Sequence, residues 1–290
     1  MSSLATQPAR GSGEFAIGGD LPVVRLGYGA MQIPGPGVWG EPRDHGEVIR
    51  VLRRAIELGV TFIDTADSYG PEVSERLIHE ALHPYPADLV IATKAGLTRP
   101  GPGRWGQNGK PEYLKAQAEK SLRLLGLERI ELFQLHSIDP TFPLADQVGA
   151  LVELQAEGKI GRIGLSNVTV PEIQAARAIT PIATVQDRYS LSDRSAQPVL
   201  EYCQREGIGF IPWFPMHTGH LAAPGGPLRR IAGEHAVTPS QLALAWLLQR
   251  SRPPWASITV SSRSLMVEPP GDAVVGAIRW RRRVAGSGRG

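Results

Sequence analysis

Ala55-Ile-Glu-Leu-Gly59 is followed directly by Val60-Thr-Phe-Ile-Asp64, and the change of pattern between these two segments indicates the fold class. The first half ends a helical pattern whose apolar residues are spaced by three and four, and glycine tolerates the left-handed conformation that closes a helix. The second half is an apolar run typical of a buried strand. The same unit, a helix end with glycine before an apolar run, recurs at Leu124-Leu-Gly126, Gln155-Ala-Glu-Gly158 and Gln204-Arg-Glu-Gly207. Helices and strands therefore alternate along the chain.

This alternation predicts an α/β fold of the closed (β/α)8 TIM-barrel type. Eight strands are expected, near residues 23–31, 61–66, 89–95, 130–136, 160–166, 183–187, 208–213 and 257–262. Helices are expected between them, most clearly at 43–58 and after the capping box Thr238-Pro-Ser-Gln241. Eight strands in about 250 residues favour the barrel over an open doubly wound sheet. The open sheet would also need a glycine-rich phosphate loop after its first strand, and Gly27-Tyr-Gly29-Ala-Met-Gln32 lacks the third glycine.

Positive charge is concentrated at the end of the sequence. The chain of 290 residues has a formal net charge of +3, but its residues from 252 onward contain seven arginines and only two acidic residues. The remainder is mildly acidic, so the overall basicity does not indicate a nucleic-acid partner. We expect residues 1–290 to form a single domain, with 1–19 as an N-terminal extension and 264–290 as an atypical basic tail.

Several classes of protein are disfavoured by what the sequence lacks. Cys203 is its single cysteine, so no internal disulfide is expected and a reducing compartment fits. The first 13 residues lack the apolar centre of a secretory signal, and no apolar run of about 18 residues is present for a membrane helix. His217 and His220 have no third metal ligand nearby. We expect a cytoplasmic protein with no bound metal and no membrane partner, and its oligomeric state stays open.

Polar side chains interrupt three consecutive predicted strands at their C-terminal ends. Asp64 and Tyr69 follow the second strand, Lys94 ends the third and His136 ends the fourth; in a barrel these ends share one mouth. A lysine kept charged by an aspartate stabilises a phenolate, so the pKa of Tyr69 is expected to fall towards neutrality and the tyrosine to act as proton donor. His136 can hydrogen-bond to a substrate carbonyl. Because no side chain supplies a hydride, reduction of that carbonyl requires a hydride-carrying cofactor.

The segment Gly59-Val-Thr-Phe-Ile-Asp-Thr-Ala-Asp-Ser-Tyr-Gly70, with Lys94, His136, Gly164-Leu-Ser-Asn167 and Gln186, resembles the aldo-keto reductase family over about residues 20–250. The resemblance implies a catalytic tetrad of Asp64, Tyr69, Lys94 and His136. It also implies NADPH as cofactor, with NADH less favoured. The residues expected to bind the cofactor are Gly29, Ala30, Met31, Asp64, Ser166, Asn167, Gln186, Trp213, Phe214, Pro215, Met216, Ser262 and Arg263.

Two segments depart from the family's pattern. Trp213-Phe-Pro-Met216 stands where the family usually has Tyr-Ser-Pro-Leu, and the tryptophan ring is expected to stack under the nicotinamide. After about Gln249 the sequence becomes rich in arginine, glycine and proline, where the family holds the 2′-phosphate of the cofactor. Ser262 and Arg263 are expected to keep part of that contact. We hypothesise that a frameshift or rapid drift altered this end.

The predicted activity is reduction of an aldehyde or ketone to an alcohol, with hydride from NADPH and a proton from Tyr69. A small carbonyl substrate is expected to meet Met31, Trp39, Tyr69, Trp105 and His136, with Trp105 in a loop over residues 97–109. Aromatic residues at the mouth favour a hydrophobic or aromatic carbonyl. Phe210-Ile-Pro-Trp-Phe-Pro215 also resembles bacterial relatives that reduce pyridoxal or sugar-like carbonyls. Two alternatives remain open, a redox-sensing subunit similar to potassium-channel β subunits and a remnant that binds cofactor poorly.

Overall fold

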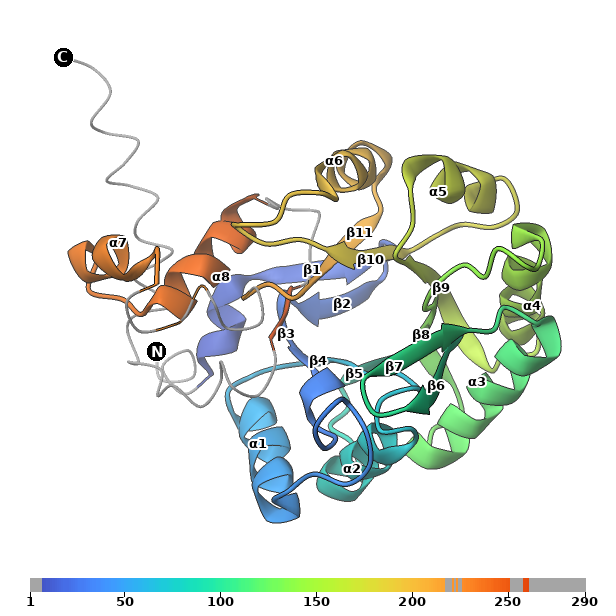
Figure 1. Cartoon of the computed structure of the whole chain (residues 1–290), viewed down its shortest axis with the longest axis horizontal. Coiled ribbons are helices and arrows are strands. Elements are labelled where there is room, and N and C mark those ends of the chain that lie inside the picture. Colours follow the sequence, from blue (N-terminus) through green and yellow to red (C-terminus); the bar gives the residue numbers. More distant parts are fainter. Residues whose placement is uncertain (1–6, 217–220, 222, 224–225, 251–257, 261–290) are drawn as a thin grey trace.

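Eight parallel strands form one continuous sheet in the computed structural model, which describes residues 7–216, 221, 223, 226–250 and 258–260. Their order is β11-β10-β9-β8-β5-β4-β3-β12. The strands at the two ends of this order, β11 and β12, lie against each other, so the sheet curls into a ring (Figure 1). The bounds are β3 Leu26–Gly29, β4 Phe62–Asp64, β5 Val90–Ala95, β8 Ile130–Leu135, β9 Ile160–Ser166, β10 Thr184–Arg188, β11 Gly209–Trp213 and β12 Ile258–Val260. This is the (β/α)8 barrel that the sequence predicts.

Helices surround the ring of strands on its outer side (Figure 1). They are α1 His45–Glu57, α2 Val73–Leu82, α3 Pro111–Leu125, α4 Leu144–Ala156, α5 Val170–Arg177, α6 Gln197–Glu206, α7 Arg229–Glu234 and α8 Pro239–Arg250, with short 3-10 turns η1 Pro8–Ser12 and η2 Ala30–Gln32. The predicted capping box before α8 is present, because Gln241 N–H donates to Thr238 Oγ1 and Thr238 N–H donates to Gln241 Oε1. Within the described residues, none of these helices is long and apolar enough to cross a bilayer.

A hairpin closes one end of the barrel. Strands β1 (Glu14–Ile17) and β2 (Leu21–Val24) pair antiparallel. Their apolar side chains pack against those inside the barrel, in one cluster of Phe15, Ile17, Val23, Phe62, Val90, Ala92, Leu132 and Ile211. The first barrel strand thus begins at Leu26, not at the predicted residue 23, because Arg25 N–H donates to Gly13 O and keeps the preceding residues in the hairpin. The predicted limits of the domain and of its terminal extensions stay a prediction.

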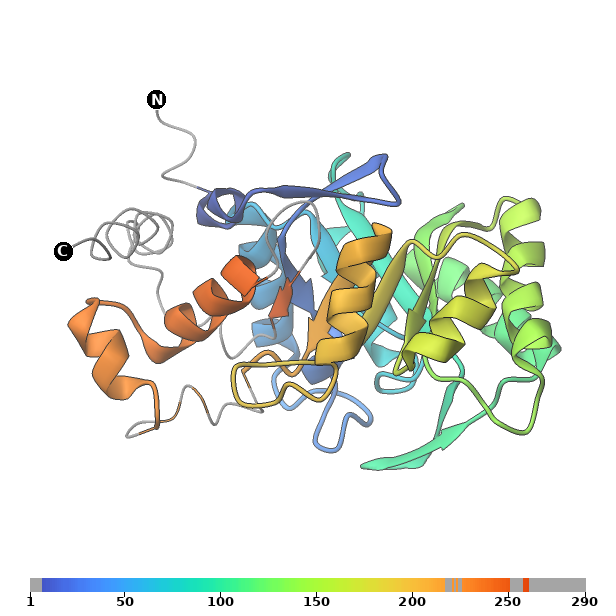
Figure 2. The ribbon, with the colours of Figure 1, turned by 90° about the horizontal axis from the view of Figure 1, so that it is seen from above.

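A second hairpin stands at the opposite end of the barrel (Figure 2). It is formed by β6 (Leu97–Gly101) and β7 (Arg104–Gln107). The sequence predicts a loop here, and that prediction is wrong. Pairing runs from Leu97 with Gln107 to Gly101 with Arg104, and its register shifts between Thr98 and Gly101. The shift accommodates Pro100, which cannot donate to a regular ladder.

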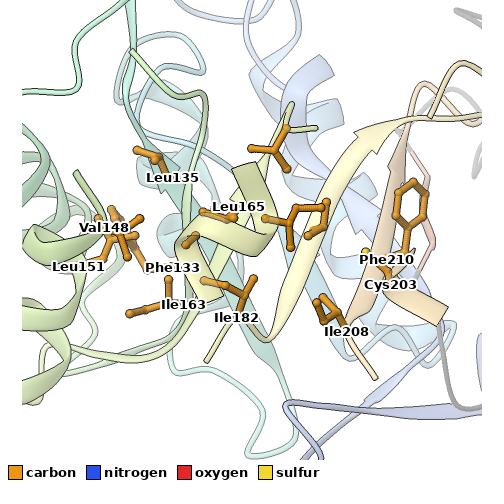
Figure 3. Packing of buried hydrophobic residues seen from close by; sticks show 14 of the residues in the cluster. Phe133, Leu135, Val148, Leu151, Ile163, Leu165, Ile182, Cys203, Ile208 and Phe210 are labelled. Atoms are coloured by element: carbon orange, nitrogen blue, oxygen red, sulfur yellow. The ribbon is translucent and has the colours of Figure 1, made fainter. Parts of the chain in front are cut away.

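Residues on each strand alternate between the barrel interior and the layer under the helices. On β8, Phe133 and Leu135 belong to the main cluster with Val148 and Leu151 of α4 (Figure 3). Leu132, one position away, belongs instead to the interior cluster. Period-two alternation of this kind is the basic geometry of a strand, and it turns alternate side chains towards the barrel axis.

Glycine at position 164 is required by crowding inside the barrel. A Cβ at Gly164 would lie 2.3 Å from Thr184 Oγ1 and 2.8 Å from Gln134 Cγ, whereas a Cβ at Gly149 on α4 would meet nothing within 4 Å. We predict that Gly164→Ala lowers the free energy of unfolding by about 1–3 kcal/mol through overpacking. Gly149→Ala, the matched control, should raise it by roughly 0.5–1 kcal/mol because alanine favours a helix. Urea unfolding measures both, and equal effects of the two substitutions would contradict the packing argument.

Candidate active site

The centre of the site is a buried ion pair between neighbouring strands. Lys94 on β5 is fully buried, and its Nζ donates to Asp64 Oδ2 of β4 at 2.9 Å and to the Thr65 carbonyl oxygen at 2.7 Å. Strands β4 and β5 pair in parallel with Asp64 opposite Ala92, which places the two side chains at the same end of the sheet. A buried ammonium keeps its charge only with such partners, and removing one of them typically costs roughly 3–5 kcal/mol.

Tyr69 and His136 lie beside this pair, as the sequence predicts. The Tyr69 ring lies with its centroid 5.2 Å from Lys94 Nζ and 5.8 Å from the centroid of His136, and the two rings are at 80° to each other. His136 is fixed by its backbone N–H, which donates to Ala95 O at 2.8 Å. Its Nδ1 is 3.4 Å from Ser68 Oγ, so Nε2 is the ring nitrogen left for a ligand. The four predicted residues therefore share one small buried space.

Protonation in this space is governed by burial. Burial raises the pKa of Tyr69 from its ordinary value, against the opposing effect of Lys94. The expected fall of this pKa towards neutrality is therefore wrong for the protein alone, since desolvation of a phenolate outweighs the nearby ammonium. Burial lowers the pKa of Lys94, but Asp64 and Tyr69 together outweigh it and the net pKa is raised. Burial, followed by Lys94, holds the pKa of His136 well below 6.5. Tyr69 is thus a neutral phenol and His136 a neutral imidazole at pH 7.

Two residues that sequence reasoning missed hold the ion pair in place. Gln134 on β8 donates through Nε2 to Asp64 Oδ1 at 3.2 Å, and its Oε1 accepts from Thr184 Oγ1 of β10 at 3.3 Å. Both side chains are fully buried. A signal was present in the sequence, because Gln134 interrupts the apolar run Phe133-Gln-Leu135 at a position where the strand would otherwise be apolar throughout.

Amide and hydroxyl side chains continue the site along β9 and β10. Gln186 pairs with Ser166 in the strand register, and its side-chain Nε2 is buried without a partner among the described residues. Asn167, at φ 57°, donates through Nδ2 to His136 O at 3.0 Å and to Ser166 Oγ at 3.1 Å. Its Oδ1 accepts from the Trp213 indole N–H at 3.1 Å. The buried amide nitrogen of Gln186 is therefore a donor that a ligand could use.

The remaining predicted residues lie at the end of β3, in the turn that follows it and in the segment after β11. Gly29 ends β3 opposite Asp64, and Ala30 and Met31 begin the η2 turn that follows. Phe214 has a left-handed φ of 53° and its ring meets that of Trp213 edge to face at 4.8 Å. Met216 is buried in an apolar cluster with Leu221, Leu228 and Ala243, and its contact with the cofactor stays a prediction. Pro215 follows Phe214 directly, and Ser262, Arg263 and the pair His217 and His220 lie outside the described residues.

Two aromatic residues expected at the substrate mouth belong to separate segments. Trp39 forms an isolated bridge with Gly70, next to Tyr69. Trp105 lies on β7 and is 39% exposed. Both rings contact the guanidinium of Arg99, a residue that sequence reasoning missed because the contact depends on the hairpin.

Comparison with known proteins assigns the class. A model of the Aldo/keto reductase family matches residues 25–268, which is most of the chain, and the chain belongs to that family. The match extends beyond residue 250, where the sequence resemblance was expected to end, and takes in the positions of Ser262 and Arg263. The hypothesis of a frameshifted or drifted end stays a prediction.

Particular relatives narrow the comparison. An uncharacterised oxidoreductase of Schizosaccharomyces pombe is 48% identical over 233 residues, covering 80% of this chain and 76% of the relative. Pyridoxine 4-dehydrogenase of Escherichia coli is 41% identical over 246 residues, covering 83% and 85%. Glycerol dehydrogenase from Gluconobacter oxydans has a similar structure, with a TM-score of 0.78 and 25% identity over 92% of this chain and 90% of that one. A Klebsiella pneumoniae aldo-keto reductase in complex with NADPH shares the fold, with a TM-score of 0.71 and 22% identity over 92% and 94%.

The raised pKa of Tyr69 gives a pH prediction. Because the neutral phenol persists to a higher pH than the ordinary value of 10.0, reduction that uses its proton should keep a constant kcat/KM from about pH 6 to about pH 9. Neutral His136 adds no titration in that range, since its pKa lies well below 6.5. Initial rates across this range measure the profile. A loss of kcat/KM centred near pH 7 that Tyr69→Phe removes would contradict it.

Proposed function

We propose that this protein is an NADPH-dependent carbonyl reductase whose substrates are aromatic aldehydes of the pyridoxal type. The observation that carries the proposal is the buried group of Lys94, Asp64, Tyr69 and His136, together with the buried amide Nε2 of Gln186, which has no partner among the described residues. Membership of the aldo/keto reductase family supports the reaction, and 41% identity to a pyridoxine 4-dehydrogenase supports the substrate class.

The residues present fit a nicotinamide carboxamide. Gln186 Nε2 is a buried donor without a partner among the described residues, and leaving such a group unpaired costs roughly 1–3 kcal/mol, which a bound carboxamide oxygen would recover. Trp213, whose indole N–H donates to Asn167 Oδ1, would offer an aromatic face to the nicotinamide. NADPH, when bound, supplies the hydride that no side chain of this chain can supply.

The chain's own residues supply the proton and the orientation. The Tyr69 phenol donates its proton to the carbonyl oxygen as the alcohol forms. Lys94, kept charged by Asp64, stabilises the phenolate that remains. Neutral His136 orients the carbonyl through Nε2, because an imidazole that stays uncharged at pH 7 can donate a hydrogen bond without adding a cation beside Lys94. In the reverse direction the same groups oxidise an alcohol.

Tyr69→Phe tests the assignment of the proton donor. We predict a loss of kcat for pyridoxal reduction of about 10²–10⁴-fold, with the NADPH dissociation constant nearly unchanged, because only the reacting proton is removed. Tyr113→Phe is the matched control, since Tyr113 is a half-buried tyrosine on α3 outside the tetrad. Steady-state kinetics and a fluorescence titration with NADPH measure the two effects. Unchanged turnover by Tyr69→Phe would overturn the assignment.

Gln186→Leu tests the proposed nicotinamide contact, because it should affect stability and NADPH binding in opposite directions. Removing an unpaired buried amide should leave the free energy of unfolding of the cofactor-free protein unchanged or raise it by about 1 kcal/mol. The same substitution should weaken NADPH binding about tenfold, because the carboxamide loses its donor. Gln155→Leu is the control, since Gln155 Nε2 donates to Gly161 O and Gln155 is not one of the predicted site residues. If Gln186→Leu binds NADPH as tightly as the unmodified protein, Gln186 does not hold the nicotinamide.

The alternative functions predict different outcomes of simple measurements. A redox-sensing subunit would give tight NADPH binding and a single round of oxidation without turnover, and a remnant would give no NADPH binding. Titration with NADPH and with NADH, followed by multiple-turnover assays with pyridoxal, distinguishes all three. We expect tight binding of NADPH, weaker binding of NADH, and sustained turnover.

A further inference from the structure

Arg99 on β6 joins three separate segments at the mouth of the barrel. Its Nη1 donates to Val38 O at 2.7 Å and to Ser68 O at 3.2 Å, and its Nη2 donates to Gly37 O at 2.6 Å. Its Nε donates to Arg104 O across the hairpin at 2.9 Å. A guanidinium has five N–H groups, so one N–H of Nη2 has no partner within the described residues.

Two tryptophans flank this guanidinium. The ring centroid of Trp105 lies 3.8 Å from Arg99 Cζ, and that of Trp39 lies 5.8 Å away. Arginine between aromatic faces is held flat and gives up little further conformational freedom when a ligand binds. The guanidinium also reaches the carbonyl of Ser68, the residue directly before Tyr69. Arg99 is therefore a preorganised cation beside the reacting centre, in a setting with aromatic surface.

No nearby carboxylate neutralises this charge in the part of the chain that is described. Arg99 has no ion pair there, and its hairpin, residues 97–107, contains two arginines and no acidic residue. In the adjacent segment, the Glu41 carboxylate pairs with Arg76. Asp67 precedes Ser68 and forms no ion pair with Arg99; burial and then Glu75 raise the pKa of its carboxyl well above the ordinary value. Lys94, a fully buried cation of the site, is already paired with Asp64.

We infer that Arg99, between Trp39 and Trp105, binds an anionic oxygen carried by the substrate, so that the reductase prefers aromatic aldehydes with a carboxylate or similar anion over neutral ones. The inference rests on the proposed function. A bound anion would take the remaining N–H of Nη2 in a charge-assisted hydrogen bond, while the aromatic ring of the substrate packs on the tryptophans. Burial lowers the pKa of Arg99, which agrees with a cation that lacks a negative partner.

A pair of matched substrates tests this inference. 4-Carboxybenzaldehyde and methyl 4-formylbenzoate have the same aldehyde and nearly the same shape, and only the first carries a negative charge. For the unmodified protein we expect kcat/KM for the carboxylate to exceed that for the ester by about tenfold to a hundredfold. Most of the difference should lie in KM, and it should shrink as salt is added. A ratio near one at low salt would overturn the inference.

Substitutions at the hairpin separate Arg99 from a general effect of charge. Arg99→Met should remove the preference by lowering kcat/KM for the carboxylate far more than for the ester, whereas Arg99→Lys should keep part of it. Arg104→Gln is the matched control, because it removes the same charge from the same hairpin while its backbone carbonyl still accepts from Arg99. Equal losses of the preference in Arg99→Met and Arg104→Gln would contradict a specific role for Arg99. So would equal losses of activity on both substrates in Arg99→Met, which would indicate that Arg99 only holds the loops together.

Calorimetry of the same two compounds on the cofactor-free protein gives a readout that does not need turnover. Binding of the carboxylate that Arg99→Met abolishes supports the subsite, and equal binding of carboxylate and ester, or none of either, contradicts it. Absence of NADPH-dependent turnover with both aldehydes, together with carboxylate binding through Arg99, would overturn the proposed function while leaving the anion subsite in place. Turnover of the ester, with the same ratio of kcat/KM for carboxylate to ester in Arg99→Met and in the unmodified protein, would overturn the anion subsite and leave the proposed function in place.

Discussion

The ion pair between Lys94 and Asp64 is the interaction on which the rest of the site depends. A fully buried ammonium would be too costly without it, and the pair fixes the ends of β4 and β5 relative to each other. Gln134 extends the network from Asp64 to β8, and Thr184 extends it to β10. A buried network whose members are hydrogen-bonded to one another favours this arrangement of the strands over others. Tyr69 and His136 are placed by that arrangement.

The barrel separates stability from chemistry along its axis. At one end the β1–β2 hairpin inserts Phe15 and Ile17 among the interior side chains, so this end is a continuous apolar core. At the other end the strands finish in polar side chains, and the β6–β7 hairpin projects from this end (Figure 2). Arg99 and Trp105 belong to that hairpin. Substitutions near the first hairpin should act on folding, whereas substitutions near the second should act on substrate choice. This division is the general pattern of barrel enzymes.

Much of this architecture could be predicted from the sequence because it rests on local patterns. The helix ends at Gly126 and Gly207 have the expected left-handed conformation, and all eight strands lie close to their predicted positions. The tetrad was predictable since each member ends or follows a strand. The β6–β7 hairpin was missed because its prolines suggest a loop. The contacts of Arg99 with Gly37, Val38 and Ser68 were not predictable because they join residues far apart in sequence. The direction of the Tyr69 pKa was missed for a related reason, since the burial that raises it is a property of the assembled site.

Transfer of deuterium from NADPH to pyridoxal tests the proposed carbonyl reduction directly. NADPH labelled with deuterium on the transferring face of C4 would be incubated with pyridoxal and the protein, and the alcohol product analysed by mass spectrometry over many turnovers. We expect pyridoxine with one deuterium on the new carbinol carbon, in an amount that exceeds the amount of protein many times. Tight binding of the labelled cofactor with no labelled alcohol from pyridoxal or any other aromatic aldehyde would contradict it.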